Sequence, residues 1–449
     1  MKDQVSALRQ SGVRAAFINS TLTPAQQHRA LSNACEGLYR IVYVAPERLL
    51  TDAFLSFACR AALDFVIVDE AHCVSQWGQD FRPAYLSIAP FLDALPERPP
   101  VGAFTATATA AVREDIAKLI GLRNPVRVLT GFDRPNLFFE VQRPDDRDRA
   151  LLAFVRRHPE ESGIVYCATR KAAEQVAALL RENGIGAGCY HAGMSDGDRA
   201  QAQEDFVSDR LPVIAATNAF GMGIDKSNVS YVVHYQMPKD LESYYQEAGR
   251  AGRDGSGAHC LLLYKPQDVR LQRFFLDKQE EESELDGETR KNVRRRAEER
   301  LREMTFYATG SGCLREKILG YFGEAAKPCG HCGNCLGLAD IRTAPGGTGD
   351  TEKRTRGKGA RLDGTRRQME KPGERRLFNR LSDLRKRVAK EQKVPPFIIF
   401  TNVTLLEMAR KRPHTRREML RVTGVGEGKM DRYGGDFLRE IEKWEEEQR

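Results

Sequence analysis

The sequence predicts an α/β protein with two consecutive parallel-sheet domains, a small metal-binding module and a C-terminal all-α domain. Three observations predict this. Short apolar runs alternate with helical patterns over residues 1–270, four cysteines gather between positions 313 and 335, and helical spacing of apolar residues returns after position 374. Continuous Val, Ile and Phe runs between helices are typical of strands buried on both faces of a parallel sheet.

Residues 1–140 form the first predicted sheet domain. Three apolar runs, at 40–50, 64–72 and 101–109, each begin as a buried strand and end in polar residues. In open parallel sheets, ligands bind where the strands end at their carboxyl edge. We therefore look for chemistry at the polar ends of these runs.

Residues 141–270 repeat the scheme and form the second predicted sheet domain. A helical pattern at 171–184 lies between apolar runs that predict strands, and a charged helical run follows at 280–303. The predicted strands are 162–170, 184–193, 211–223, 229–238 and 259–266.

An acidic pair, Asp69-Glu70, follows the apolar run DFVIV and precedes Ala71-His72. A carboxylate at a strand end can hold Mg²⁺ through water, because Mg²⁺ keeps several waters and takes few protein carboxylates. The adjacent Glu can orient and deprotonate a water that attacks a phosphate. An ordinary surface loop is the alternative interpretation.

The second domain contains QEAGRAGRDG at 246–255, with Arg250 and Arg253 three residues apart at one helical face. Guanidinium groups suit phosphate oxygens and can stabilise charge in a phosphoryl-transfer transition state. The alternative is an exposed basic helix, but Gly beside each Arg weakens a helix without structural return.

Four cysteines have the spacing of a tetrahedral zinc site: Cys313, Cys329, Cys332 and Cys335. Closed sites of four thiolates are structural, and disulfides are rare in the cytosol. His331 is the alternative ligand, although it lies between two of the cysteines. We expect the other six cysteines to be buried, reduced thiols: Cys35, Cys59, Cys73, Cys167, Cys189 and Cys260.

The region after the cysteines carries the excess of positive charge. Residues 341–373 are rich in Gly, Thr, Arg and Lys and read as a flexible linker, whereas 374–449 predict a small helical domain. From position 341 onward there are 28 Lys and Arg against 17 Asp and Glu, while the whole chain has a net charge of +8. This charge indicates an anionic polymer partner or a solvated tail.

Taken together, DEAH and QEAGRAGRDG resemble motifs II and VI of the second helicase superfamily. The segment 73–83, CVSQWGQDFRP, resembles the aromatic-rich loop of the RecQ family. The resemblance spans residues 1–340, with 271–340 matching the family's zinc module, and residues 374–449 resemble the HRDC domain. The further matching segments are MKDQV, APERL, TATAT, FDRPN, VYCATR, YHAGM and ATNAFGMGIDK.

The resemblance implies two RecA-like domains that bind Mg²⁺ and ATP between them, and a 3′-to-5′ DNA helicase of recombination and repair. Asp69 would bind Mg²⁺, and Glu70 would orient and deprotonate the attacking water. Arg253 would act as the arginine finger, with Arg250 also reaching the phosphates. The implied DNA partners are single strands and branched or duplex junctions. His72 and Gln246 join the implied catalytic residues, and Gly223 and Asp225 join those near the nucleotide.

The resemblance also implies residues that contact DNA. Aromatic faces stack on bases of any sequence, and Arg adds phosphate or cation–π contacts. For Trp77 and Phe81 the alternative is plain core, but their polar neighbours favour a loop. For the turn GVGEGK at 424–429, a capping turn is the alternative. The implied residues are Trp77, Phe81, Arg82, Thr105, Arg170, His191, Thr217 and Lys429.

The chain departs from the family pattern in three places. No P-loop, GxxxxGK(S/T), occurs in the 449 residues, so we expect the first RecA-like domain to be incomplete and the chain alone to be inactive. Gln79 stands where the family has His, and 341–373 is too short and polar for a winged helix. A non-catalytic DNA-binding protein is thus the alternative function, and an RNA helicase is disfavoured by the aromatic loop and the cysteines.

The sequence also bears on location. No stretch approaches 18 uninterrupted apolar residues, and the N-terminal MKDQVSALRQ has no apolar signal core. We therefore expect a cytoplasmic, nucleoid-associated protein without a membrane partner.

Overall fold

The computed structural model describes residues 4–5, 8–9, 12–20, 22–61, 63–78, 80–159, 161–221, 226–282, 287–338, 372–392 and 394–448. The chain divides into two compact units, which are described separately. The first holds residues 1–132, 284–297 and 319–325, and the second holds the remainder. No helix in the described part of the chain is long and apolar enough to cross a bilayer.

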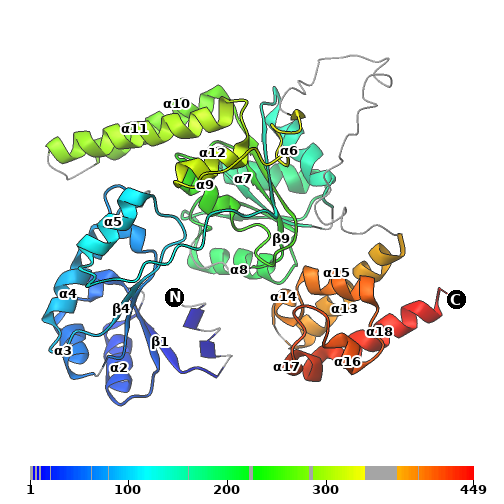
Figure 1. Cartoon of the computed structure of the whole chain (residues 1–449), viewed down its shortest axis with the longest axis horizontal. Helices are drawn as coiled ribbons and strands as arrows, with labels where there is room; N and C mark the ends of the chain where they lie inside the picture. The colour runs from blue at the N-terminus through cyan, green and yellow to red at the C-terminus, as the bar shows by residue number, and fades with distance from the viewer. Residues whose placement is uncertain are drawn as a thin grey trace. The chain divides into compact units, whose positions relative to one another are not determined.

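The first RecA-like domain contains two separate pairs of parallel strands, β1–β2 and β3–β4 (Figure 1). Its helices and strands share one apolar core. The elements are β1 (Ala15–Ile18), α2 (Pro24–Cys35), β2 (Ile41–Val44), η1 (Pro46–Arg48), α3 (Asp52–Arg60), β3 (Val66–Val68), η2 (Ala71–Val74), η3 (Pro83–Ser87), α4 (Ile88–Ala94), β4 (Val101–Ala103) and α5 (Ala110–Leu119).

One face of the β3–β4 pair is apolar and exposed. Phe65, Ile67 and Phe104 are 68%, 59% and 58% exposed. Strands of parallel sheets are normally covered on both faces. Among the described residues, these three side chains on this face of the pair are therefore left largely uncovered.

The second RecA-like domain holds a six-stranded parallel sheet with the order β5-β10-β9-β6-β8-β7. All five strands predicted there are present, and α7 coincides with the predicted helix at 171–184. The elements are β5 (Leu137–Gln142), α6 (Arg147–Arg156), β6 (Ser162–Tyr166), α7 (Arg170–Glu182), β7 (Ala187–Tyr190), α8 (Asp196–Val207), β8 (Val213–Ala216), β9 (Val229–His234), α9 (Leu241–Ala248) and β10 (Ala258–Leu263).

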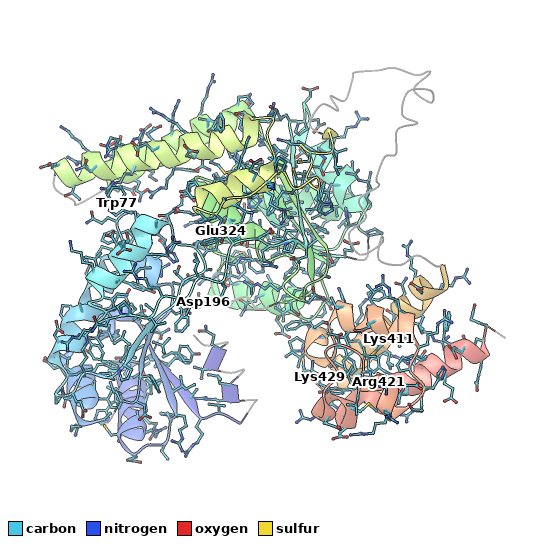
Figure 2. All side chains as sticks on the ribbon, viewed as in Figure 1. Trp77, Asp196, Glu324, Lys411, Arg421 and Lys429 are labelled. Atoms are coloured by element: carbon cyan, nitrogen blue, oxygen red, sulfur yellow. The ribbon has the colours of Figure 1, made fainter. Side chains whose placement is uncertain are left out.

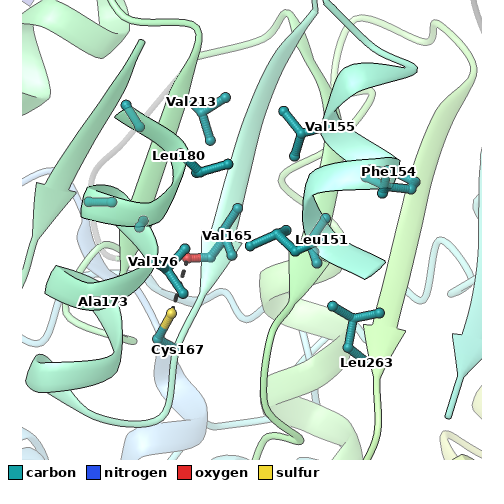
Figure 3. Packing of buried hydrophobic residues seen from close by; sticks show 14 of the residues in the cluster. Leu151, Phe154, Val155, Val165, Cys167, Ala173, Val176, Leu180, Val213 and Leu263 are labelled. Atoms are coloured by element: carbon teal, nitrogen blue, oxygen red, sulfur yellow. Dashed lines mark hydrogen bonds between the residues drawn. The ribbon is translucent and has the colours of Figure 1, made fainter. Parts of the chain in front are cut away.

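The core between α6, α7 and this sheet is tightly packed (Figure 3). Leu151, Phe154 and Leu180 are fully buried in it, and each such side chain stabilises the fold by about 1.5–3 kcal/mol. α7 begins at a proper cap, because the Thr169 hydroxyl accepts a hydrogen bond from the N–H of Ala172. The core and the cap together fix the carboxyl ends of the strands, where the functional side chains emerge.

Gly163 on β6 makes the closest approach in this sheet. It pairs with Tyr231 on β9, and a Cβ at position 163 would lie 1.9 Å from the ring of that buried tyrosine. Gly163→Ala should therefore lower the free energy of unfolding by roughly 1–3 kcal/mol through overpacking. Denaturant unfolding followed by hydrogen exchange of β6 and β9 measures this loss.

Gly287→Ala is the matched control, since nothing lies within 4 Å of a Cβ there and the residue begins a helix. It should be neutral or slightly stabilising. Equal stabilities of the two variants would contradict the packing described for Gly163.

The zinc module consists of α10 (Pro266–Glu281), α11 (Gly287–Thr309), α12 (Leu314–Tyr321) and the cysteine loop. The α-helical C-terminal domain has its own core, with fully buried Leu381, Phe400 and Phe437. Its elements are α13 (Pro372–Gln392), α14 (Pro396–Ile399), α15 (Asn402–Lys411), α16 (Arg416–Met419), α17 (Glu427–Lys429), η6 (Met430–Gly434) and α18 (Gly435–Glu446).

The expectation for two of the six scattered cysteines is wrong. Cys35 and Cys59 are exposed, because they lie near the C-terminal ends of α2 and α3 on faces turned away from the core. Cys73, Cys167 and Cys260 are buried as expected, and Cys189 is half-buried. Burial raises the pKa of Cys73 and of Cys260 to about 12, so both thiols stay protonated.

Candidate active site and metal centre

The acidic pair lies at the carboxyl end of β3. Asp69 is exposed, and its Oδ1 accepts a hydrogen bond of 2.9 Å from the N–H of Glu70. Glu70 has a left-handed backbone, with φ of +47°. Such a conformation costs a non-glycine residue about 1–3 kcal/mol and persists only where its surroundings hold it. The N–H of Ala71 donates to the carbonyl of Phe104 at 2.9 Å and fixes this turn.

His72 connects the acidic pair to the TATAT segment. The imidazole is buried, and its Nδ1 lies 2.9 Å from the hydroxyl of Thr105 and 3.3 Å from Oε2 of Glu70. Two segments that are 33 residues apart thus meet at one histidine. The Thr105 hydroxyl, predicted to contact DNA, is used here inside the domain.

The hydroxyl of Ser75 connects the aromatic loop to α5. Its hydroxyl donates to Asp115 on α5 at 2.6 Å and accepts from the N–H of Trp77 at 3.1 Å. Gly78 follows, and a Cβ there would lie 2.6 Å from the carbonyl oxygen of His72, so the turn needs glycine. Trp77 is 44% exposed, which excludes the plain-core alternative for this side chain.

Phe81 and Arg82, further along the loop, are half-buried. The Arg82 guanidinium donates two hydrogen bonds to Asp80, at 2.6 and 2.9 Å. Arg82 and Asp80 are therefore paired with each other.

In the second RecA-like domain, the two predicted arginines differ in environment. Arg253 is exposed, whereas Arg250 is only 8% exposed. A Cβ added at Gly221 would lie 3.1 Å from the Arg250 guanidinium. The positive charge of Arg250 lies near the phenol of Tyr166, whose hydroxyl donates to the carbonyl of Phe220 at 2.8 Å. Burial raises the pKa of Tyr166, and the neighbouring positive charge of Arg250 opposes this rise.

The turn that carries these arginines is held by the FDRPN segment. The guanidinium of Arg134 donates to the carbonyls of Gly249, Ala251 and Gly252, at 3.0–3.4 Å. The amide of Asn136 donates to Gly252 and to Ser256. These carbonyls have no strand partners, so Arg134 and Asn136 set the path of the backbone around Arg250.

Arg315, from the zinc module, in turn holds the FDRPN segment. It is 7% exposed, and its guanidinium donates to the Asp133 carboxylate and the Arg134 carbonyl, both at 2.6 Å. It also donates to the carbonyls of Pro135 and Leu137. Sequence reasoning missed Arg315, because its partners lie about 180 residues away and no spacing marks it.

The four cysteines form one metal site. Their sulfur atoms lie within 4.8 Å of one another, close to the separation of about 3.8 Å that tetrahedral Zn–S bonds of 2.3 Å require. The N–H groups of Cys329 and Glu316 point at the Cys313 sulfur. Burial opposes ionisation of this thiol, but these N–H groups outweigh it and lower the pKa of Cys313 to about 7. Burial raises the pKa of Cys329 and of Cys335, so these contacts favour the thiolate, the form that binds Zn²⁺, at Cys313.

His331 is not part of this sulfur cluster. Its ring packs against Phe138 in an edge-on arrangement, with centroids 5.3 Å apart. Among the described residues the metal-binding group contains the four cysteines alone, as the first interpretation predicted. The loop is anchored to the second sheet, since the N–H of Gly333 donates to the carbonyl of Phe139.

Three further residues predicted to contact DNA follow strands of the second sheet. Arg170 is exposed, and Thr217 is buried. His191 is buried, with Nδ1 accepting from the N–H of Gly193 and Nε2 3.0 Å from Glu174. The His191 imidazole thus makes its contacts within the domain, whereas the Arg170 side chain is exposed to solvent.

Lys429 lines an open groove of about 580 Å³ in the C-terminal domain, with Ile398, Val425 and Tyr433. Burial lowers its pKa, and its ammonium lies 5.9 Å from the centroid of the Phe400 ring. Within the described part of the chain no carboxylate pairs with it. An anion in the groove would therefore offset the cost of holding this charge away from water.

Several predictions concern residues outside the described ones. These are the roles of Gly223 and Asp225, the departure at Gln79, and the linker before α13. Gln246, on α9, is half-buried one turn before Arg250.

Four family models match the chain. A DEAD/DEAH box helicase model matches residues 1–116, and a helicase conserved C-terminal domain matches 146–255. A RecQ zinc-binding model matches 266–336, and an HRDC domain matches 374–441.

Curated relatives agree with these models. The ATP-dependent DNA helicase RecQ of Bacillus subtilis is 37% identical over 525 residues, which cover 99% of this chain and 87% of the relative. The protein of the same name from Haemophilus influenzae is 32% identical, with 99% and 85% covered. The alignment with the Bacillus protein spans 525 positions and this chain has 449 residues, so at least 76 positions of that relative face gaps here.

Proposed function

The chain belongs to the RecQ family of ATP-dependent DNA helicases, and on that premise we propose how its own residues serve the motor. The family uses Mg²⁺-ATP, holds a structural Zn²⁺ and acts in DNA repair and recombination. For this member we propose 3′-to-5′ movement along single-stranded DNA, at branched or duplex junctions. We place it in the cytoplasm, at the nucleoid.

Asp69 and Glu70 form the acidic half of the proposed ATP site. Asp69 would hold Mg²⁺, which when bound neutralises phosphate charge, and Glu70 would accept a proton from the attacking water. The observation that carries this proposal is the contact of His72 with both Glu70 and Thr105. It orients the carboxylate from the side and ties it to the segment that follows β4.

Gln246, Arg250 and Arg253 supply the other half, with Gly223 and Asp225 near the nucleotide. Exposed Arg253 is the proposed finger, because an accessible guanidinium can reach a phosphoryl group. Arg250 is buried beside Tyr166, so it would contact phosphate only after a change of side-chain conformation.

DNA contacts are assigned to the aromatic loop and to the polar ends of the strands. Trp77 would stack on a base, with Phe81 beside it and Arg82 released from Asp80 towards phosphate. Thr105, Arg170, His191 and Thr217 complete this set. The exposure of Trp77 and Arg170 supports direct contact, and the buried His191 and Thr217 would act by shaping the backbone.

A winged helix is not part of the proposed machinery. The RecQ zinc-binding model ends at residue 336, and the HRDC model begins at residue 374. At least 76 positions of the Bacillus relative face gaps in this chain. We therefore propose that this member lacks the usual duplex-separating hairpin. A non-catalytic DNA-binding protein is the second candidate function, favoured by the absent P-loop.

The groove around Lys429 provides a test of auxiliary DNA binding. Lys429→Ala should reduce the slope of log K against log salt by about 0.7 for a single-stranded oligonucleotide, because one phosphate contact is lost. Fluorescence anisotropy with a labelled dT oligonucleotide at several salt concentrations measures the slope.

Lys411→Ala is the matched control, since it removes the same charge from the same domain (Figure 2). The Lys411 ammonium already pairs with Glu407 and donates to the carbonyl of Arg421. The slope should then stay unchanged, and identical slopes for both variants would refute a phosphate site at Lys429.

A further inference from the structure

The first half of α11 is strongly basic. Between positions 287 and 297 it carries one acidic residue, Glu288, against five basic ones. Residues 287–297 belong to the same compact unit as the aromatic loop. The basic residues are Arg290, Lys291, Arg294, Arg295 and Arg296.

One of these arginines covers Trp77. The guanidinium carbon of Arg296 lies over the indole ring, 3.2 Å from its centroid. This is van der Waals contact, so a planar group fills that face of the ring. A nucleic-acid base cannot stack on the same face while Arg296 is there.

We propose that Arg296 belongs to a single-strand binding site with Trp77, covering the ring in the free protein and moving to a backbone phosphate when a base takes its place. This inference rests on the proposed binding of single-stranded DNA by the aromatic loop. It adds a residue from the zinc module that sets the free state of the loop and supplies a phosphate contact in the bound state.

The geometry of the loop supports an exchange at the ring rather than a movement of the backbone. Ser75 is fully buried and fixes the N–H of Trp77, and Gly78 fits closely against His72. The backbone on both sides of Trp77 is thus preorganised. Trp77 is 44% exposed, so its ring remains open to the solvent from which DNA arrives.

The chemistry of the two partners gives the direction of the exchange. An exposed cation–π contact is weaker than stacking of a base on an aromatic ring. The released guanidinium does not lose its interactions, because a nearby phosphate accepts bidentate hydrogen bonds from it. The remaining basic residues of α11 keep the phosphate backbone close by.

Tryptophan fluorescence tests this proposal on the 449-residue chain. The chain has two tryptophans, so Trp444→Phe leaves Trp77 as the only reporter. Adding dT15 should change its emission. Arg296→Ala should shift the emission of the free protein and lower the salt slope of dT15 binding by about 0.7, equivalent to about a fivefold change in affinity per tenfold change in salt.

Arg295→Ala is the control, because Arg295 is the exposed neighbour with the same charge. It should leave the emission of free Trp77 unchanged. Arg296→Lys should retain the salt slope, since the charge remains, but shift the emission, since the planar stack is lost. Equal effects of Arg296→Ala and Arg295→Ala on emission and slope would overturn the proposal.

Trp77→Ala separates this proposal from the proposed function. If it weakens dT15 binding while Arg296 and Arg295 variants behave alike, the loop binds DNA and only the exchange is wrong. If Trp77→Ala leaves binding intact, or the unmodified chain does not bind dT15, the role of the aromatic loop fails and the exchange fails with it.

Discussion

Replacing Cys332 with serine should release the zinc ion and unfold the cysteine loop. The Cys332 sulfur is fully buried and accepts hydrogen bonds from the N–H groups of Leu314 and Cys335. Structural zinc sites contribute on the order of 10 kcal/mol to the folding of their modules. Metal content should fall from about one zinc ion per chain, and amides of residues 310–338 should lose protection from exchange.

The effect should extend to the arginines of the second RecA-like domain. Arg315 lies two residues after Cys313 and holds the FDRPN segment, whose Arg134 holds the turn around Arg250. Loss of the zinc loop should therefore accelerate amide exchange at 249–253. The strands β6 and β8, which are buried in their own core, should keep their protection.

Arg315→Ala tests this coupling without removing a zinc ligand. It leaves carbonyls of the FDRPN segment without their hydrogen-bond donor. Because a hydrogen bond from a charged group contributes about 1.5–3 kcal/mol, the amide exchange rate at 249–253 should increase by at least about tenfold. The zinc content should stay at one ion per chain. Unchanged exchange at 249–253 in both variants would show that the zinc module and this turn are independent.

Cys35→Ser is the control for the cysteine substitution, because Cys35 is exposed and lies far along the chain from the metal site. It should change neither zinc content nor exchange at 249–253. The pH dependence adds a further check. Because protons compete with Zn²⁺ for the four sulfur ligands, metal should be lost more readily as the pH falls.

The sequence predicted most of the second sheet because its strands are continuous apolar runs. It missed β5, and the reason is Glu140 within that strand. This carboxylate interrupts the apolar pattern, yet it is buried, since His259 on β10 approaches it at 2.7 Å from 119 residues away. A boundary at position 140 would divide β5, which lies wholly in the second sheet. Strand β1 was missed because its four residues, AAFI, are too short to show a period.

The site could be predicted only where residues are adjacent along the chain. The acidic pair, the two arginines and the cysteines stand in compact motifs, so their chemistry follows from spacing. Arg315 and Arg296 act on partners about 180 and 219 positions away, which no local pattern records. The sequence therefore predicted the residues whose own side chains bear the functional groups. It missed those that position such a side chain, as Arg315 does, or lie over it, as Arg296 does.

The unmodified 449-residue chain should hydrolyse ATP no faster than its own Glu70→Gln variant. The chain contains no GxxxxGK(S/T), so it lacks the backbone N–H cradle and the lysine that bind the β- and γ-phosphates. Removing a single preorganised donor of this kind costs about 10²–10³-fold in rate, and here the whole set is missing. Any residual signal should therefore come from the background and not from the acidic pair.

Phosphate release with and without dT15 measures this, with unmodified chain, Glu70→Gln and Arg253→Ala prepared side by side. Equal rates of phosphate release by all three proteins, together with dT15 binding, would identify the 449-residue chain as a DNA-binding protein without a working motor. A rate that DNA stimulates and that both substitutions abolish would instead show that its ATP site works without a P-loop. The separation of the described strands into the pairs β1–β2 and β3–β4 favours the first result, because the strand that carries a P-loop belongs in the same sheet.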